Sequence, residues 1–135
     1  YTSNISLKKS LLNKHKFDRD FKSYGWEDIE LAYRLTKKEN LEIIYLKKAL
    51  AYHDHEISEA SLKNRMIAVG KSLHIFQKKH KELKLIPRNI KKLLLSLIGS
   101  KILVFILKYL PGRFFKRLYW YSLSKRYFMQ GIKSV

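Results

Sequence analysis

Apolar and polar residues follow one another along the chain in patterns that predict mainly helices. Residues 26–38 place apolar side chains at helical spacing on one face and charged side chains on another. A second helical pattern starts at Ser58, a residue type that caps helices, and continues to about Leu83. The apolar run at 87–110 predicts a third helix, which Pro111 ends.

Shorter segments have the composition of strands. Residues 5–13 indicate a short strand that runs into a helical turn, and residues 41–46 and 47–55, rich in Ile, Tyr and Leu, predict a strand or two. The loop composition of residues 16–26 separates these segments. We therefore expect an α/β fold, mostly helical with a few short strands and with long, basic, amphipathic helices at the C-terminal end.

The charge of the chain is distributed unevenly. Of the net charge of +18 over 135 residues, residues 1–57 contribute +2 and residues 58–135 contribute +16. A nearly neutral first part that holds most of the acids suits a site for chemistry, whereas the basic second part suits a polyanionic surface of phospholipid or nucleic acid. Cysteine is absent, so disulfides and thiolate metal sites are excluded.

Three carboxylates, Glu27, Asp28 and Glu30, open the helix predicted at 26–38. Acidic residues in the first turn stabilise a helix through its dipole, which is one explanation of the cluster. Helical spacing, however, places Asp28 on the apolar face, where an unpaired carboxylate is costly. A helix N-terminus would keep that carboxylate ionised, as a general base must be.

Glu30 and Arg34 lie one helical turn apart, and this spacing predicts an ion pair. The same helical pattern places the pair on the outer face of the helix. A neutral replacement of Glu30 is therefore expected to have a mild effect on activity.

Histidines cluster at the end of the second predicted strand, where His53 and His55 flank Asp54. Strand alternation places both histidines on one side of the strand. The pair is either a candidate for metal binding or a polar strand end without a ligand. Residues 18–20, Asp-Arg-Asp, match an Asp-x-Asp metal motif, but no apolar strand precedes them, so we interpret them as loop. The remaining histidines, predicted to lie at the surface among lysines, are His15, His74 and His80.

An ordered string of residues resembles the acceptor-side half of the family 2 glycosyltransferases, which have the GT-A fold. The similarity covers residues 2–57 and thins to Arg65 and Gly70 in the following helix. The matching residues are Asn4-x-Ser6, Phe17-Asp18, Phe21, Tyr24-Gly25-Trp26-Glu27-Asp28-x-Glu30-Leu31-x-x-Arg34 and Ala49-x-Ala51-Tyr52-His53.

The resemblance implies roles for the residues near the acceptor. Asp28 would be the catalytic base and Glu27 its neighbour in acceptor binding. Trp26 would form an apolar wall for a sugar ring, and Asn4 would lie near the donor sugar. The implied reaction is inverting transfer of a sugar from a nucleotide-sugar to a hydroxyl group of a glycan or lipid-linked acceptor.

The resemblance also implies a divalent cation, Mn²⁺ or Mg²⁺, that bridges the donor diphosphate. His53 would join this metal, with His55 as the alternative ligand. Arg65, together with Lys63, would reach the leaving diphosphate.

The nucleotide-binding half of such an enzyme is absent from these residues, and the chain begins without Met. We therefore expect the C-terminal part of a longer enzyme, inactive in isolation and prone to self-association. The expected divisions are 1–57 (acceptor and metal half), 58–86 (connecting helix) and 87–135 (basic, aromatic tail).

The tail is predicted to lie on an anionic membrane surface, at the cytoplasmic face of the cell membrane. Residues 93–110 are about long enough to span a bilayer, but Lys101 near their middle disfavours insertion. Two alternatives stay open: this apolar surface packs on the missing half or on a second copy, or the tail is part of a basic helical module that binds nucleic acid. The nucleic-acid alternative gives no reason for the ordered string of motifs.

Overall fold

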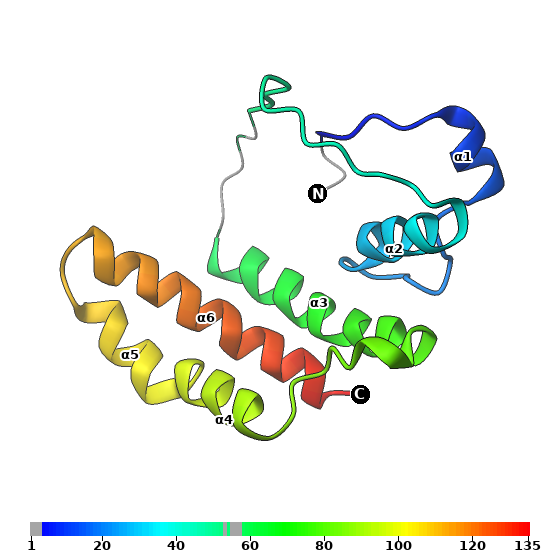
Figure 1. Cartoon of the computed structure of the whole chain (residues 1–135). Helices are drawn as coiled ribbons and strands as arrows, with labels where there is room; N and C mark the ends of the chain where they lie inside the picture. Colours follow the sequence, from blue (N-terminus) through cyan, green and yellow to red (C-terminus); the bar gives the residue numbers. More distant parts are fainter. Residues whose placement is uncertain (1–3, 53, 55–57) are drawn as a thin grey trace.

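The computed structural model describes residues 4–52, 54 and 58–135, and this part of the chain is helical without any strand. Three helices, α2, α3 and α6, are the longest elements (Figure 1). The elements in chain order are α1 (Lys9–Lys14), α2 (Glu27–Glu39), α3 (Glu59–Lys79), the 3-10 helix η2 (Lys81–Leu83), α4 (Asn89–Ile98), α5 (Lys101–Tyr109) and α6 (Arg113–Lys133).

The prediction of an α/β fold is wrong for the described residues. Residues 40–52 leave α2 as an irregular segment, and the segment predicted at 5–13 forms α1 without a strand before it (Figure 1). A strand is stable only when another strand pairs with its backbone, and no described segment pairs with residues 40–52. The side chain of Asn4 instead donates a hydrogen bond to the carbonyl of Ala49, at 2.8 Å.

Helix α3 begins where the sequence predicts. The Ser58 hydroxyl accepts a hydrogen bond from the Ser61 amide, and the Ser61 hydroxyl accepts one from the Ser58 amide, each at 3.1 Å. This reciprocal cap satisfies two of the amides that a helix start leaves without partners. The helix ends at Lys79, a few residues before the predicted Leu83, which lies in η2.

Helices α3 and α6 cross in close contact at two glycines. A Cβ atom added to Gly70 would lie 2.8 Å from the amide nitrogen of Ile132, and one added to Gly131 would lie 3.0 Å from the Cα of Gly70. Side chains at these positions would force the two backbones apart. Beside the crossing, Leu73, Met129 and Ile132 form a buried apolar cluster, covered by half-buried side chains of Trp26, Leu85, Ile86, Leu95 and Phe128.

The third predicted helix is in fact two helices, because the helical conformation is interrupted at Gly99 and Ser100. A Cβ atom at Gly99 would lie 2.7 Å from the amide nitrogen of Arg126, so the end of α4 packs directly on the backbone of α6. Ser100 then caps α5 by accepting a hydrogen bond from the amide of Leu103 at 3.2 Å. The prediction that the helix ends at Pro111 is confirmed, since α5 ends at Tyr109.

Among the described residues, no helix is both long and apolar enough to cross a membrane.

A second apolar cluster holds α5 against α6. Leu107, Tyr119 and Leu123 are its buried members. The Tyr119 hydroxyl donates a hydrogen bond to the Glu59 carboxylate, which ties α6 to the start of α3. Burial, together with this carboxylate, raises the pKa of Tyr119 to about 12.

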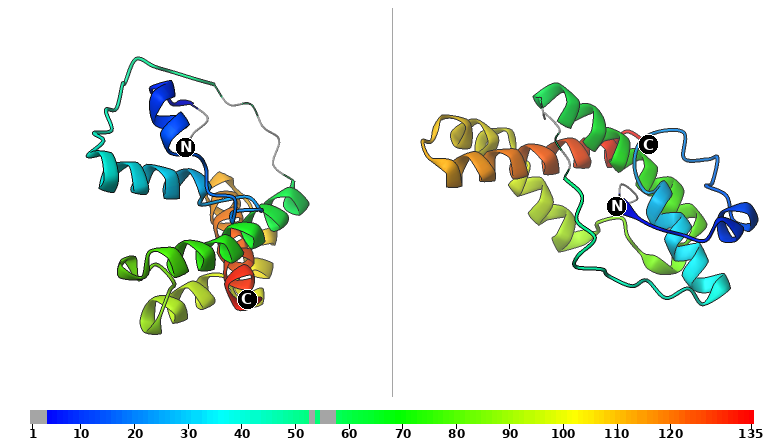
Figure 2. Two further views of the ribbon diagram at one scale, coloured as in Figure 1. Left: turned by 90° about the vertical axis from the view of Figure 1, so that its right-hand side faces the viewer. Right: turned by 90° about the horizontal axis from the view of Figure 1, so that it is seen from above.

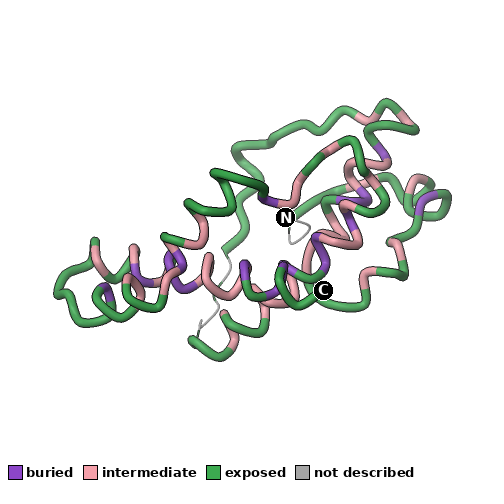
Figure 3. The backbone as a smooth tube through the Cα atoms, turned by 90° about the horizontal axis from the view of Figure 1, so that it is seen from below, coloured by how far each residue is buried: buried purple, intermediate pink, exposed green. Residues whose placement is uncertain are grey.

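The helices are arranged around α3 and α6. In Figure 1, α2 lies above α3 and α6 below it, and the left view of Figure 2 again shows α2 above α3. Helices α4 and α5 follow one another along α6, which both of them contact. Figure 3 shows that buried positions gather along the inner faces of the helices, whereas residues 42–52 are exposed.

Replacement of Gly70 by Ala should destabilise the protein, although Ala favours a helix more than Gly does. The added methyl group would press on the backbone of α6, so the free energy of unfolding should fall by about 1–3 kcal/mol. Urea denaturation measures the loss. Lys71→Ala, at the next and exposed position of α3, is the matched control and should change stability by less than about 0.5 kcal/mol. Equal stability of Gly70→Ala and the control would contradict the close crossing.

Candidate functional site

The turn before α2 has a strained backbone. Gly25 has φ 104° and Trp26 has φ 73°, so two consecutive residues adopt left-handed conformations. Gly tolerates such angles, whereas a large aromatic residue rarely adopts them, at a cost of about 1–3 kcal/mol. Gly25 also packs on α3, where an added Cβ atom would lie 2.8 Å from a methyl group of Val69. The turn is therefore fixed both by its dihedral angles and by its close contact with α3.

Packing of the Trp26 side chain offsets this strain. The indole nitrogen donates a hydrogen bond to the carbonyl of Val69 at 3.1 Å, and the indole ring lies 5.4 Å from the ring of Phe76. The side chain is thus part of the contact between the turn and α3. Trp26 therefore anchors the turn to α3. Its predicted role as a wall for a sugar ring stays a prediction, which only the exposed part of the indole ring could fulfil.

The candidate catalytic carboxylates lie directly after this turn, at the N-terminal end of α2. Asp28 is half-buried, and its Oδ1 accepts a hydrogen bond from the amide of Ile29 at 2.8 Å. Oε2 of Glu27 is buried and has no hydrogen-bond partner within the described structure. A buried carboxylate oxygen without a partner is uncommon and calls for an explanation, such as a ligand that donates to it.

Glu30, predicted on the outer face of α2, is one of the most buried side chains, with 2% of its surface exposed. The predicted pair with Arg34 does form: Nε donates to Oε1 and Nη2 to Oε2, each at 3.0 Å. Arg34 also donates to the carbonyl of Lys16 at 2.8 Å, and His80 lies 3.3 Å from Oε1 of Glu30. The outer-face prediction is wrong because these distant partners cover the pair. The hydrogen-bonded carboxylate of Glu30 raises the pKa of Arg34.

The histidines predicted at the surface are also largely covered. His80 packs between the rings of Tyr33 and Phe76, at centroid distances of 4.8 and 5.0 Å. His15 is buried, with Nε2 2.6 Å from Oε1 of Glu39. His74 is half-buried and donates to the carbonyl of Ile132 at 2.9 Å. Each has a polar partner far away in the sequence, which a local pattern does not reveal.

The Asp-Arg-Asp segment lies in a loop, as predicted, and is bridged by a lysine of α3. Nζ of Lys79 lies 2.6 Å from a carboxylate oxygen of Asp18 and 2.6 Å from one of Asp20. The hydrogen bond from Lys79, followed by one from the Asp20 amide, lowers the pKa of Asp18. The two carboxylates in turn raise the pKa of Lys79. This bridge joins the loop before α2 to the end of α3.

The residues predicted to contact the diphosphate lie on one helix. Arg65, from α3, stacks on the Tyr24 ring, 4.8 Å from its centroid, and donates to the Tyr24 hydroxyl at 3.1 Å. The structure thus brings Arg65 to the turn that precedes Asp28. Lys63 is exposed on the same helix. Asn4 binds the carbonyl of Ala49 and lies in a different part of the chain, near residues 40–52.

The predicted metal ligands, His53 and His55, lie outside the described residues. Within residues 4–52, 54 and 58–135, no three side chains of His, Asp or Glu are grouped so that they could hold a metal ion. The described residues therefore do not form a metal site by themselves.

Comparison of the chain with protein-family models, curated protein sequences and solved structures gave no match.

Replacement of Glu30 by Gln should be strongly destabilising, although the sequence predicts only a mild effect on activity. The substitution leaves the Arg34 guanidinium facing a neutral group, and breaking a buried pair costs about 3 kcal/mol. Urea denaturation measures this loss against Glu42→Gln, an exposed control that should behave like the unmodified chain. A loss below about 0.5 kcal/mol would show that the pair does not stabilise the position of α2.

The Lys79 bridge should make stability dependent on pH. Because the pKa of Asp18 is lower in the folded chain than its usual value of 3.8, its contribution is present above that value and is lost as the pH falls through the folded pKa. Lys79→Met should therefore reduce the free energy of unfolding by about 0.5–1 kcal/mol near neutral pH. The difference from the unmodified chain should shrink below about pH 3.

Urea denaturation at the two pH values tests this dependence. Lys78→Met, at an exposed neighbouring position, is the matched control and should have no effect at either pH. An effect of Lys79→Met that is the same at both pH values would contradict the role of Asp18.

Proposed function

We propose that this chain is the acceptor-side part of an inverting glycosyltransferase, which transfers a sugar from a nucleotide-sugar to a hydroxyl group. The main support is the strained turn of Gly25 and Trp26, which holds Glu27 and Asp28 at the N-terminal end of α2. Backbone strain of this kind persists where the surrounding structure enforces it, and it is concentrated at functional sites. The second support is the ordered resemblance to family 2 glycosyltransferases described above.

The position of Asp28 suits a general base. Asp28 lies in the first turn of α2, at the positive end of the helix dipole. Its carboxylate is half-buried, and one of its oxygens is oriented by a hydrogen bond from the Ile29 amide. The other oxygen would take the proton from the hydroxyl group of the acceptor substrate. At the neighbouring position, Oε2 of Glu27 is buried without a hydrogen-bond partner within the described structure.

The proposed reaction follows from these positions. Asp28 takes the proton of an acceptor hydroxyl, and the resulting oxygen attacks the anomeric carbon of the donor sugar. The bond from that carbon to the nucleoside diphosphate breaks, and the diphosphate leaves with the bonding electrons. Arg65, held beside the turn by Tyr24, is placed to attract this anion. The divalent cation that the resemblance implies stays part of the proposal, because its predicted ligands, His53 and His55, lie outside the described residues.

Binding of nucleic acid through the aromatic tail is less well supported. Base stacking requires exposed rings, but Tyr119 is buried and Trp120, Tyr127 and Phe128 are half-buried against neighbouring helices. Packing therefore accounts for these four aromatic residues of α6 without a nucleic acid, whereas Phe114 and Tyr121 of the same helix are exposed.

Replacement of Asp28 by Asn tests the proposal in the protein that carries this chain. Loss of a general base should reduce the rate of sugar transfer by about 10²–10⁴-fold, measured as release of nucleoside diphosphate with acceptor present. Donor binding should hardly change, since Asp28 acts on the acceptor. Glu42→Gln, an exposed acid beyond the end of α2, is the control and should retain full activity. Retention of more than about a tenth of the activity by Asp28→Asn would refute its role as base.

A further inference from the structure

Helices α4 and α5 each have two apolar faces, of which only one is covered. Leu95 of α4 and Leu103, Val104 and Leu107 of α5 pack toward α6 and its clusters. The opposite faces carry a second set at helical spacing, whose members are between 49% and 74% exposed. We call this set the outer ridge; its residues are Ile90, Leu93, Leu94 and Leu97 of α4 and Ile102, Phe105, Ile106 and Tyr109 of α5.

The outer ridge is spread over two helices that follow one another along α6 (Figure 1). Since α4 and α5 both pack on α6 with their other apolar face, we infer that the ridge lies on their side away from α6. A soluble surface rarely exposes so many adjacent large apolar side chains without a partner. Phe114, at the start of α6 after the turn at Gly112, is a further exposed apolar side chain, with 66% of its surface exposed.

Cations accompany the ridge, and anions are absent from this part of the sequence. Lys91, Lys92, Lys101 and Lys108 are exposed on the same two helices. Residues 83–135 contain 12 Lys or Arg and no Asp or Glu. A partner for this surface must therefore be apolar at its centre and anionic around it.

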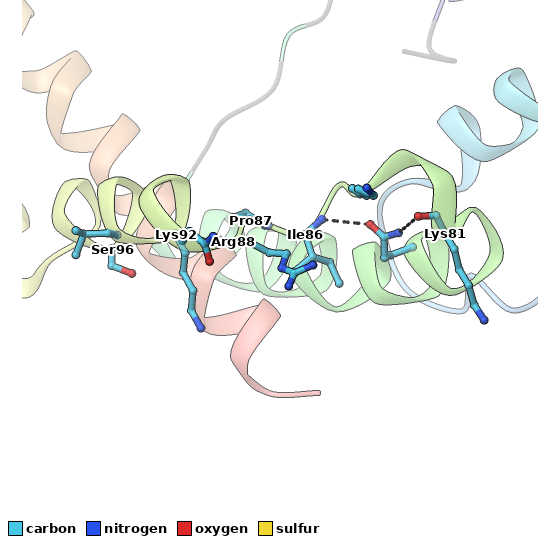
Figure 4. Close-up of a pocket in the computed structure, with 10 residues that line it drawn as sticks. Lys81, Ile86, Pro87, Arg88, Lys92 and Ser96 are labelled. Atoms are coloured by element: carbon cyan, nitrogen blue, oxygen red, sulfur yellow. Dashed lines mark hydrogen bonds between the residues drawn. The ribbon is translucent and has the colours of Figure 1, made fainter.

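A cationic hollow adjoins the ridge where α3 passes into α4. Figure 4 shows this hollow, with Lys81, Arg88 and Lys92 among its labelled side chains. Gln77 fixes its wall, because its side chain donates to the carbonyl of Lys81 at 3.2 Å and accepts from the amides of Leu85 and Ile86. Leu93 lines the hollow and also belongs to the ridge, so cations and apolar side chains meet there.

We propose that the outer ridge docks on an anionic phospholipid membrane, with α4 and α5 lying in the plane of the interface. Apolar side chains of the ridge would enter the boundary of the acyl chains, while lysines extend to the phosphates. The charge decides between this partner and a second copy of the chain, because a copy would bring like charges together whereas an anionic lipid surface neutralises them. This inference does not depend on the proposed sugar transfer.

The test is co-sedimentation of the whole chain with vesicles of phosphatidylcholine alone or mixed with phosphatidylglycerol. The ridge variant combines Ile102→Ser, Phe105→Ser and Tyr109→Ser. The control combines Ile43→Ser, Ile44→Ser and Tyr45→Ser, which remove equally exposed apolar side chains from residues 40–52. Circular dichroism verifies that both variants keep the helical content of the unmodified chain.

The unmodified chain and the control should bind mixed vesicles alike, and the ridge variant at least about tenfold more weakly. Lys101→Gln combined with Lys108→Gln should weaken binding to mixed vesicles by about tenfold, whereas Lys37→Gln combined with Lys38→Gln on α2 should not.

Four results would overturn the proposal. Two concern the vesicles: equal binding of the ridge variant and the control, or equal binding of the unmodified chain to both kinds of vesicle. In the other two, the unmodified chain does not bind vesicles; it instead self-associates through the residues changed in the ridge variant, or it binds nucleic acid.

Discussion

The close crossing of α3 and α6 is the constraint on which the rest of the fold depends. Gly70 and Gly131 let the two backbones touch, so that the neighbouring Leu73, Met129 and Ile132 can form a buried cluster. Every other described helix longer than two turns packs on this pair: α4 and α5 along α6, and α2 against α3 through the rings of Tyr33 and Phe76. The pair is therefore the frame of the fold: α2, with the candidate site, packs on α3, and α4 and α5, with the outer ridge, pack on α6.

The carboxylates of α2 are held on this frame by a charged contact. Glu30 is buried between Arg34 of its own helix and His80 beyond the end of α3, and rings of Tyr33 and Phe76 enclose His80. A buried charge is costly unless it is paired and hydrogen-bonded, so these partners define one orientation of α2. That orientation, with the strained turn before it, determines where Asp28 lies.

Local signals in the sequence predicted the helices but not their packing. Ser58 marks the start of α3, and the spacing of Glu30 and Arg34 predicts their ion pair, because both depend on residues a few positions apart. The burial of that pair depends on His80, fifty residues away, and on the Lys16 carbonyl. The strand prediction failed over the described residues 41–52 because β-branched and aromatic residues form a strand only beside another strand. The break at Gly99 likewise comes from contact with Arg126.

The central claim is that α2, with its carboxylates, is held on a separately stable α3–α6 frame by the buried contact of Glu30. Native-state hydrogen exchange in Arg34→Met tests it most directly. The claim predicts that amides of α2 lose protection by about 100-fold, since a pair worth about 3 kcal/mol is broken, while amides at the centres of α3 and α6 keep theirs. Unchanged protection of α2, or an equal loss in all three helices, would contradict it.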